Sequence, residues 1–84
     1  MNIKDFEAIV AEMEMAQEDL QVSLEIQNNL IADLAEITFQ SIINPKLIPE
    51  AEYTFDKLQL IDAIVQECQD EVNCMISLLS ENPN

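Results

Sequence analysis

An unbroken heptad pattern of apolar residues near the C-terminus constrains this chain more than any other feature. The residues are spaced alternately three and four apart, and they are Leu58, Ile61, Val65, Cys68, Val72, Met75 and Leu79. This spacing places all of them on one stripe of an α-helix, which is the a/d seam of a coiled coil. The seam predicts a helix that packs lengthwise against another helix, and therefore an all-α fold.

The segment that precedes the seam is predicted to be one long helix. The chain contains no glycine, and its three prolines all lie beyond Ile43. From about residue 4 to residue 43 the composition favours a helix without interruption, which predicts a length of roughly 58 Å. Asn2 is a candidate N-cap, and Asp5 suits the positive end of the helix dipole.

Two prolines mark the connection to the second helix. Pro45 and Pro49 cannot occupy a helix interior, so the connection is short and the next helix must run back antiparallel. Pro49 in a first turn predicts a second helix over about residues 50–80, although Thr54 is a competing N-cap. The chain is thus predicted to be a single helical-hairpin domain over residues 1–84.

The first helix carries two apolar stripes when its faces are read at about 100° per residue. The first stripe consists of Phe6, Ile9, Met13, Ala16, Leu20, Leu24, Gln27, Ile31, Leu34 and Thr38. The second lies about a quarter-turn away and consists of Ala8, Met15, Val22, Ile26, Leu30 and Ile37. Gln27 and Thr38 are polar members of the first stripe, and they either fix the register or lie at its solvated margin.

The second stripe predicts a further partner, because one neighbouring helix covers only one stripe. Burying a Leu or Ile side chain contributes about 1.5–3 kcal/mol, so leaving this stripe in water would forgo several kcal/mol. That is comparable with the whole stability of a small domain. We expect a homodimer of hairpins forming a four-helix bundle, or another protein on the same surface. The predicted contact residues are Val22, Ile26, Leu30, Ile37 and Ile64.

The net charge of the chain limits the kinds of partner that it is expected to bind. Seventeen acidic residues stand against three lysines, the formal net charge is −14, and no cation lies between Lys4 and Lys46. Such a surface repels nucleic acid and anionic membranes and attracts basic proteins, so direct binding to either of the former is not expected. The acidic steering surface is predicted to consist of Glu7, Glu14, Glu18, Glu25 and Glu36.

Missing residue types argue against catalysis. The chain has no histidine, no glycine and no arginine, which removes imidazole acid–base chemistry, phosphate-cradling loops and bidentate anion clamps. An enzyme is not expected, and neither is a cofactor. Acidic clusters on both helices could attract cations, but charges at these spacings usually form a solvated face, so no metal site is predicted. These clusters are Glu12, Glu14, Glu18 and Asp19, and Glu67, Asp70 and Glu71.

The two cysteines and the N-terminus bear on location. Cys68 and Cys74 lie six residues apart on one predicted helix, roughly 9 Å along its axis, which is beyond disulfide range. Free thiols favour a reducing compartment. The N-terminus lacks the basic start and apolar run of a secretory signal, and the longest purely apolar run is the four residues 8–11, too short to span a bilayer. The expected location is the cytoplasm.

Together these features predict a small acidic interaction module of the adaptor, chaperone, antitoxin or immunity, or inhibitor type, which binds a basic or amphipathic protein. In size and in its proline-marked turn the chain resembles helical-hairpin chaperones of bacterial type III secretion, and that resemblance implies a chaperone role. The alternative is a nucleic-acid mimic that blocks a DNA- or RNA-binding protein, as in phage or mobile-element inhibitors. A purely structural subunit is a third interpretation.

Overall fold

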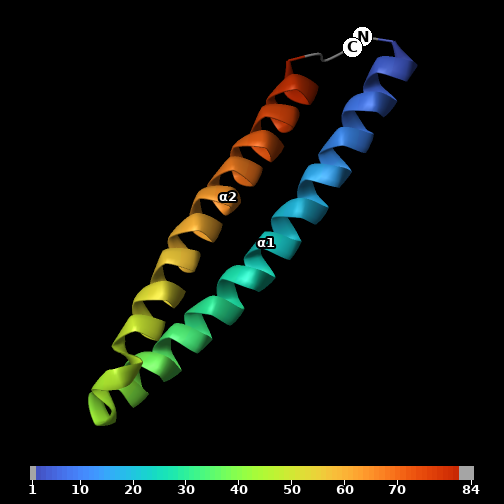
Figure 1. Cartoon of the computed structure of the whole chain (residues 1–84). Coiled ribbons are helices and arrows are strands. Elements are labelled where there is room, and N and C mark those ends of the chain that lie inside the picture. The colour runs from blue at the N-terminus through green and yellow to red at the C-terminus, as the bar shows by residue number, and fades with distance from the viewer. Residues whose placement is uncertain (1, 82–84) are drawn as a thin grey trace.

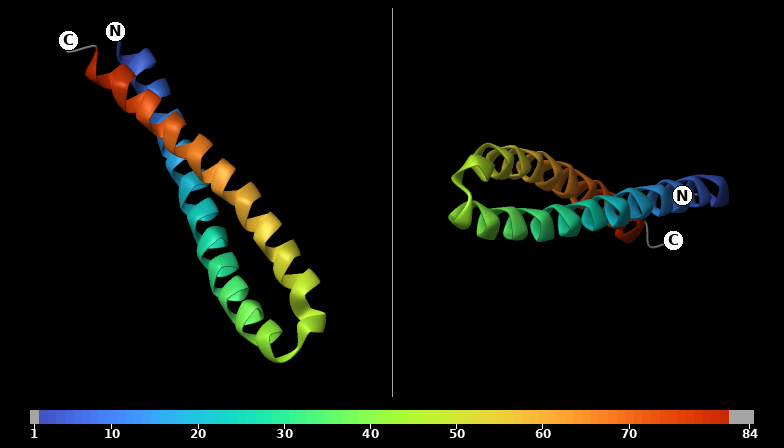
Figure 2. Two further views of the ribbon diagram at one scale, coloured as in Figure 1. Left: turned by 90° about the vertical axis from the view of Figure 1, so that its left-hand side faces the viewer. Right: turned by 60° about the horizontal axis from the view of Figure 1, so that its bottom comes forward.

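The computed structural model describes residues 2–81, and within them it confirms an all-helical chain with two long helices. Helix α1 covers Ile3–Ile43, a short 3₁₀ turn η1 covers Pro45–Leu47, and α2 covers Ile48–Ser80. The two helices lie side by side along their length, and the ends of the described chain meet at the same end of the molecule (Figure 1). Figure 2 shows the same arrangement from two further directions.

Helix α1 begins at the predicted cap. The Asn2 side chain accepts a hydrogen bond from the Asp5 backbone N–H at 2.9 Å, which satisfies one of the donors that a helix start leaves free. At the other end, the Asn44 N–H donates to the Gln40 carbonyl. The helix therefore covers the range expected from the sequence, extended by one residue at its start.

The turn between the helices is held by Asn44. Its side chain accepts a hydrogen bond from the Lys46 backbone N–H at 3.2 Å. Helix α2 then begins at Ile48, two residues before the predicted start, because Pro49 lies in the first turn, where its missing N–H costs nothing. Thr54 is not an N-cap: it lies inside α2, and its hydroxyl donates back to the Glu50 carbonyl at 2.9 Å.

The heptad seam of α2 is confirmed. All seven of its residues are buried or half-buried, and Ala51 and Thr54 continue the same spacing toward the turn. The buried hydrophobic residues among the described part of the chain are Ala16, Ile61, Val65 and Val72. This core is small for a chain of 84 residues.

The seam of α1 differs from the predicted stripe. Apart from Val10, the shielded positions are spaced four and three apart and are Ile9, Met13, Ala16, Leu20, Ser23, Gln27, Leu30, Leu34, Ile37 and Ser41. Leu30 and Ile37, predicted to contact an outside partner, are thus half-buried along the seam, whereas Leu24, Ile31 and Thr38 are exposed. The reason is geometric: two helices that stay in contact keep a 3.5-residue repeat, and a stripe drawn on a straight helix drifts from it by about 20° per heptad.

Two polar contacts cross the seam and set the register of the helices. The Gln27 side-chain amide donates to the Asp62 carboxylate. The buried Ser23 hydroxyl donates to the Asp19 carbonyl at 2.7 Å and lies 4.0 Å from the Cys68 Sγ. Gln27 is half-buried and its hydrogen bond to Asp62 is exposed to solvent, whereas Thr38 is exposed and lies at the margin.

The molecule is a rod. Its Cα atoms extend over 62 × 15 × 13 Å and have a radius of gyration of 18.8 Å. A compact domain of this length has a radius of gyration of about 12 Å. A rod only two helices wide has no interior beyond one seam, so many large apolar side chains remain at its surface.

Candidate functional site

The register divides the surface into two long sides. The contacts of Gln27 with Asp62 and of Ser23 with Cys68 place Ile26 level with Ile64. Each seam has two flanks. In an antiparallel pair, the flank of α1 that holds Ile26 lies beside the flank of α2 that holds Ile64. The opposite flank holds Leu24 on α1 and Asp62 on α2, and these two flanks also lie beside each other. Each side therefore draws on both helices.

One side is acidic with an apolar centre, and we name it the acidic face. Its apolar residues are exposed and are Val22, Ile26, Leu60 and Ile64. The surrounding carboxylates are exposed as well and are Asp19, Asp33, Glu36, Glu67 and Glu71. The face thus combines an apolar patch shared by both helices with a rim of negative charge.

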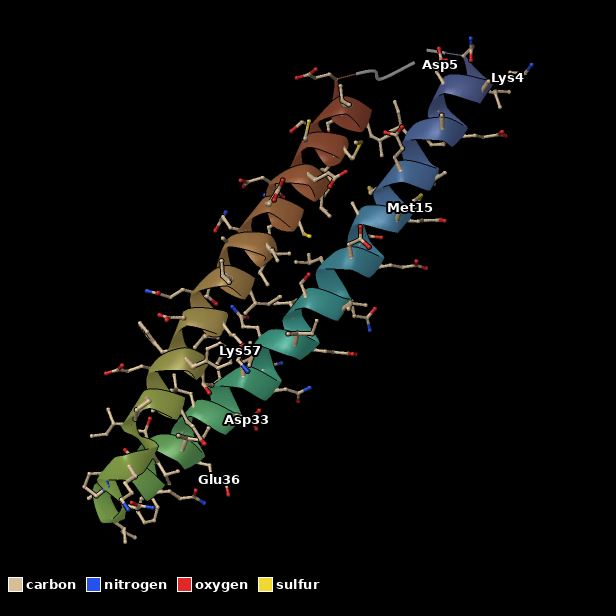
Figure 3. The ribbon with its side chains drawn as sticks, viewed as in Figure 1. Lys4, Asp5, Met15, Asp33, Glu36 and Lys57 are labelled. Atoms are coloured by element: carbon tan, nitrogen blue, oxygen red, sulfur yellow. The ribbon has the colours of Figure 1, made fainter. Side chains whose placement is uncertain are left out.

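Lys57 is the one cation in this part of the described surface. Its Nζ lies 4.7 Å from the centroid of the Tyr53 ring, within cation–π range. Figure 3 shows Lys57 on α2 at the same level as Asp33 on α1. Toward the N-terminus the rim is purely acidic, because Asp19 of α1 is level with Glu71 of α2.

That level pair yields a stability prediction. Replacing Glu71 with lysine places a cation at the level of the exposed Asp19 in place of a second carboxylate, and we expect the free energy of unfolding to rise by about 0.5–1 kcal/mol at low salt. Urea denaturation in 10 mM and 500 mM salt measures it, since screening should remove the gain. Asp70→Lys is the matched control, because it changes the charge equally on the outer side of α2.

The predicted contact residues fall into two groups. Val22, Ile26 and Ile64 are exposed by 55, 44 and 46% and lie together in the acidic face. Leu30 and Ile37 are half-buried along the seam between α1 and α2, so they lie apart from this exposed group. The patch also includes the exposed Leu60, which was not among the predicted contact residues.

Only part of the predicted acidic steering surface borders the acidic face. All five of its glutamates are exposed, but only Glu36 borders the acidic face. Glu18 and Glu25 lie on the back of α1, and Glu7 and Glu14 lie toward its N-terminus on the other side. The carboxylates nearest the apolar patch are instead Asp19, Asp33, Glu67 and Glu71. A heptad assignment that accepts Ser23 as a seam residue would have found them.

The other long side carries almost no charge, and we name it the neutral face. Its exposed residues on α1 are Gln17, Gln21, Leu24, Asn28, Ile31, Ala35 and Thr38. On α2 they are Ile48, Phe55, Gln59, Gln66, Gln69, Asn73 and Ile76. The acids on or bordering this span are Glu52, Asp56 and Asp62; Glu52 and Asp56 line the groove near the turn, and Asp62 accepts the Gln27 hydrogen bond.

Two grooves open on the neutral face. The larger has a volume of about 480 Å³, and its walls come from both helices near the turn, with Thr38, Ile48 and Phe55 among them. The smaller has a volume of about 240 Å³ and lies between Leu20 and Gln69. The grooves confirm that these flanks of α1 and α2 share one side.

The residues that the structure describes form no metal-binding cluster. Over residues 2–81 no group of three or more histidine, cysteine or acidic side chains is arranged to hold a metal ion. Cys68 is half-buried, Cys74 is exposed, and both are free. In the same span neither helix is apolar enough over a sufficient length to cross a membrane.

Comparisons with protein-family models, with curated proteins and with solved structures find no match to this chain.

Proposed function

We propose that this chain is a small acidic helical module for protein–protein interaction, and that its acidic face binds a basic or amphipathic segment of another protein. The observation that carries the proposal is the exposed apolar patch at Val22, Ile26 and Ile64, surrounded by carboxylates. Adaptors, chaperones, antitoxin or immunity proteins and inhibitors all work through such surfaces, and the partner decides among them.

The geometry of the patch suits a helical partner. Val22 and Ile26 lie one turn apart on α1, Leu60 and Ile64 lie one turn apart on α2, and Ile26 is level with Ile64. An amphipathic helix with apolar residues at i and i+4 can cover these positions, as helices do in other apolar grooves. Lysine or arginine beside its apolar stripe would then meet Asp19, Asp33 and Glu71, which steers the encounter and selects basic partners.

The proposed protomer is the antiparallel hairpin, which dimerises into a four-helix bundle and acts without catalysis or cofactor. Exposed large hydrophobic residues on both long sides support association, because burying the remaining exposed half of such a side chain contributes about 1 kcal/mol. A cytoplasmic location fits the free thiols of Cys68 and Cys74.

A synthetic peptide tests the partner chemistry. The probe is a fluorescent 20-residue helical peptide with leucines along one face and lysines along the other, titrated with the protein in 150 mM salt. Ile26→Gln/Ile64→Gln keeps the charge and removes the apolar contact, so we expect its affinity to fall about 100-fold, the equivalent of about 3 kcal/mol. The matched control, Ile31→Gln/Phe55→Gln on the neutral face, should stay within threefold of the wild type.

One outcome of the same titration would contradict the proposed binding patch. Equal affinities for the two double variants would show that the peptide only senses overall negative charge, and the proposed patch would be wrong. A scrambled peptide of identical composition should bind at least tenfold more weakly, because its lysines no longer lie on one side of an apolar stripe.

The second candidate function, nucleic-acid mimicry, is favoured by the charge and shape of the rod. A net charge of −14 over 62 Å is one charge per about 4 Å, against one per about 1.7 Å in duplex DNA. A side-by-side dimer would halve the spacing. A mimic predicts that duplex DNA competes for the partner, that binding falls steeply with salt, and that Ile26→Gln/Ile64→Gln binds as well as the wild type.

A further inference from the structure

We infer that the neutral face is the surface through which two copies of this chain pair, which leaves the acidic face of each copy outward and free. The sequence placed both self-association and partner binding on one stripe of the first helix. The structure separates two sides, and their charges fit different occupants. This inference rests on the proposed dimer and assigns its pairing surface, but it does not depend on what the acidic face binds.

The exposed area of a single chain supports a second copy. The chain exposes 6296 Å² and has a mass of 9.5 kDa, whereas a compact folded monomer of that mass exposes about 5,000 Å². The excess is about 1,200 Å², which exceeds the roughly 800 Å² that each partner contributes to a standard interface. If a second copy covers one long side of the hairpin, the surface area that each chain exposes therefore falls to that of a compact protein.

The apolar pattern fits a bundle helix rather than an isolated pair. Helices that face a bundle core carry apolar residues at a, d and one flanking position. On α1 the flank holds Leu24 and Ile31, and on α2 it holds Ile48, Phe55 and Ile76, so both helices widen their apolar stripes toward the same side. The groove of about 480 Å³ between Thr38 and Phe55 gives that side a recess for side chains of the second copy.

Charge selects the neutral face over the acidic one. Each copy carries a formal charge of −14, so self-association must keep carboxylates apart. Pairing through the acidic face would bring the rims of Asp19, Asp33 and Glu71 from both copies together. Pairing through the neutral face instead brings together mainly apolar side chains and amides, which can donate and accept hydrogen bonds with one another. Its carboxylates, Glu52, Asp56 and Asp62, are fewer than those of the acidic face, and Asp62 already accepts the Gln27 hydrogen bond.

Mass in solution tests this inference with two matched variants. Size-exclusion chromatography with light scattering at 100 μM should give the wild type twice the 9.5 kDa mass of one chain. Ile31→Asp/Phe55→Asp should give the mass of one chain. Ile26→Asp/Ile64→Asp adds the same charge on the acidic face and should remain a dimer.

Circular dichroism on each sample separates dissociation from unfolding. If the neutral-face aspartate variant loses its helical signal, Ile31→Gln replaces it, and its dimer dissociation constant should be at least tenfold above the wild-type value. A monomeric wild type overturns the inference, and so does an acidic-face variant that dissociates as readily as the neutral-face one. A monomeric wild type would also contradict the proposed dimer, whereas dissociation of the acidic-face variant would contradict only the choice of pairing surface. The peptide titration measures partner binding at the acidic face separately, so that binding can fail while the pairing surface stands.

Discussion

Replacing Val65 with aspartate is expected to unfold the chain. Val65 is 6% exposed and lies in the middle of the α2 seam, where its side chain packs toward α1. A carboxylate there has no cation to pair with, and an uncompensated buried charge costs several kcal/mol. Small domains have about 5–15 kcal/mol of stability in total, and a core of this size places the chain at the low end. Circular dichroism at 222 nm measures the loss of helix.

Ala63→Asp provides the control for that variant. Ala63 is exposed on the outer side of α2, two residues from Val65, and the substitution adds the same charge to the same helix. Its helical signal should remain within a few per cent of the wild type. If both variants kept their helicity and their resistance to urea, the seam would not hold the two helices together.

Removing the break between the helices is expected to change the topology of the chain. In the variant Asn44→Ala/Pro45→Ala/Pro49→Ala nothing remains that ends a helix between Ile3 and Ser80, because the chain has no glycine and alanine is the strongest helix former. The two helices should fuse into one, of about 117 Å at 1.5 Å per residue. Two such helices can pair antiparallel and rebuild the same seam between chains, as in domain swapping.

Small-angle X-ray scattering measures that change. The maximum dimension should become close to twice the 62 Å extent of the wild-type rod, with no loss of helical signal. Lys46→Ala is the control, since it alters the turn and keeps Pro45 and Pro49. An unchanged maximum dimension in the triple variant would show that the seam alone, without the prolines, is enough to fold the chain back.

The helices and the seam of α2 were predictable because local chemistry determines them. Asn2 caps α1, Pro45 and Pro49 interrupt the helix, and the spacing from Leu58 to Leu79 leaves one possible inner stripe for α2. These features involve neighbouring residues only. The sequence therefore contains them without any knowledge of how the helices pack.

The seam of α1 was harder to predict because its inner positions are not the most apolar ones. Ser23 is buried although it is polar, and its hydroxyl is satisfied by the Asp19 carbonyl four residues earlier. Leu24 and Ile31 are more hydrophobic than the seam residue Gln27 and yet lie outside. The packing against α2 decides which residues of α1 lie in the seam. It therefore also decides which carboxylates surround Ile26.

The separation of an acidic face from a neutral face follows from that register. Asp19, Asp33 and Glu71 come from distant parts of the chain and gather around Ile26 and Ile64 only when the helices are aligned. Glutamates chosen from one helix alone, such as Glu7 and Glu14, could not reveal the rim. The candidate site is therefore a property of the paired helices.

The central claim is that one long side of the rod is covered by a second copy while the other side stays open to a partner. Four isoleucines test it directly, because their exposures in a single chain are nearly equal: 44% for Ile26, 46% for Ile64, 49% for Ile31 and 47% for Ile76. The measurement is methyl NMR of wild-type protein, with the isoleucine δ1 methyls labelled and a neutral gadolinium chelate added. A dimer paired through the neutral face should show strong relaxation of Ile26 and Ile64 and protection of Ile31 and Ile76. Equal relaxation of all four methyls, or protection of Ile26 and Ile64 instead, would contradict it.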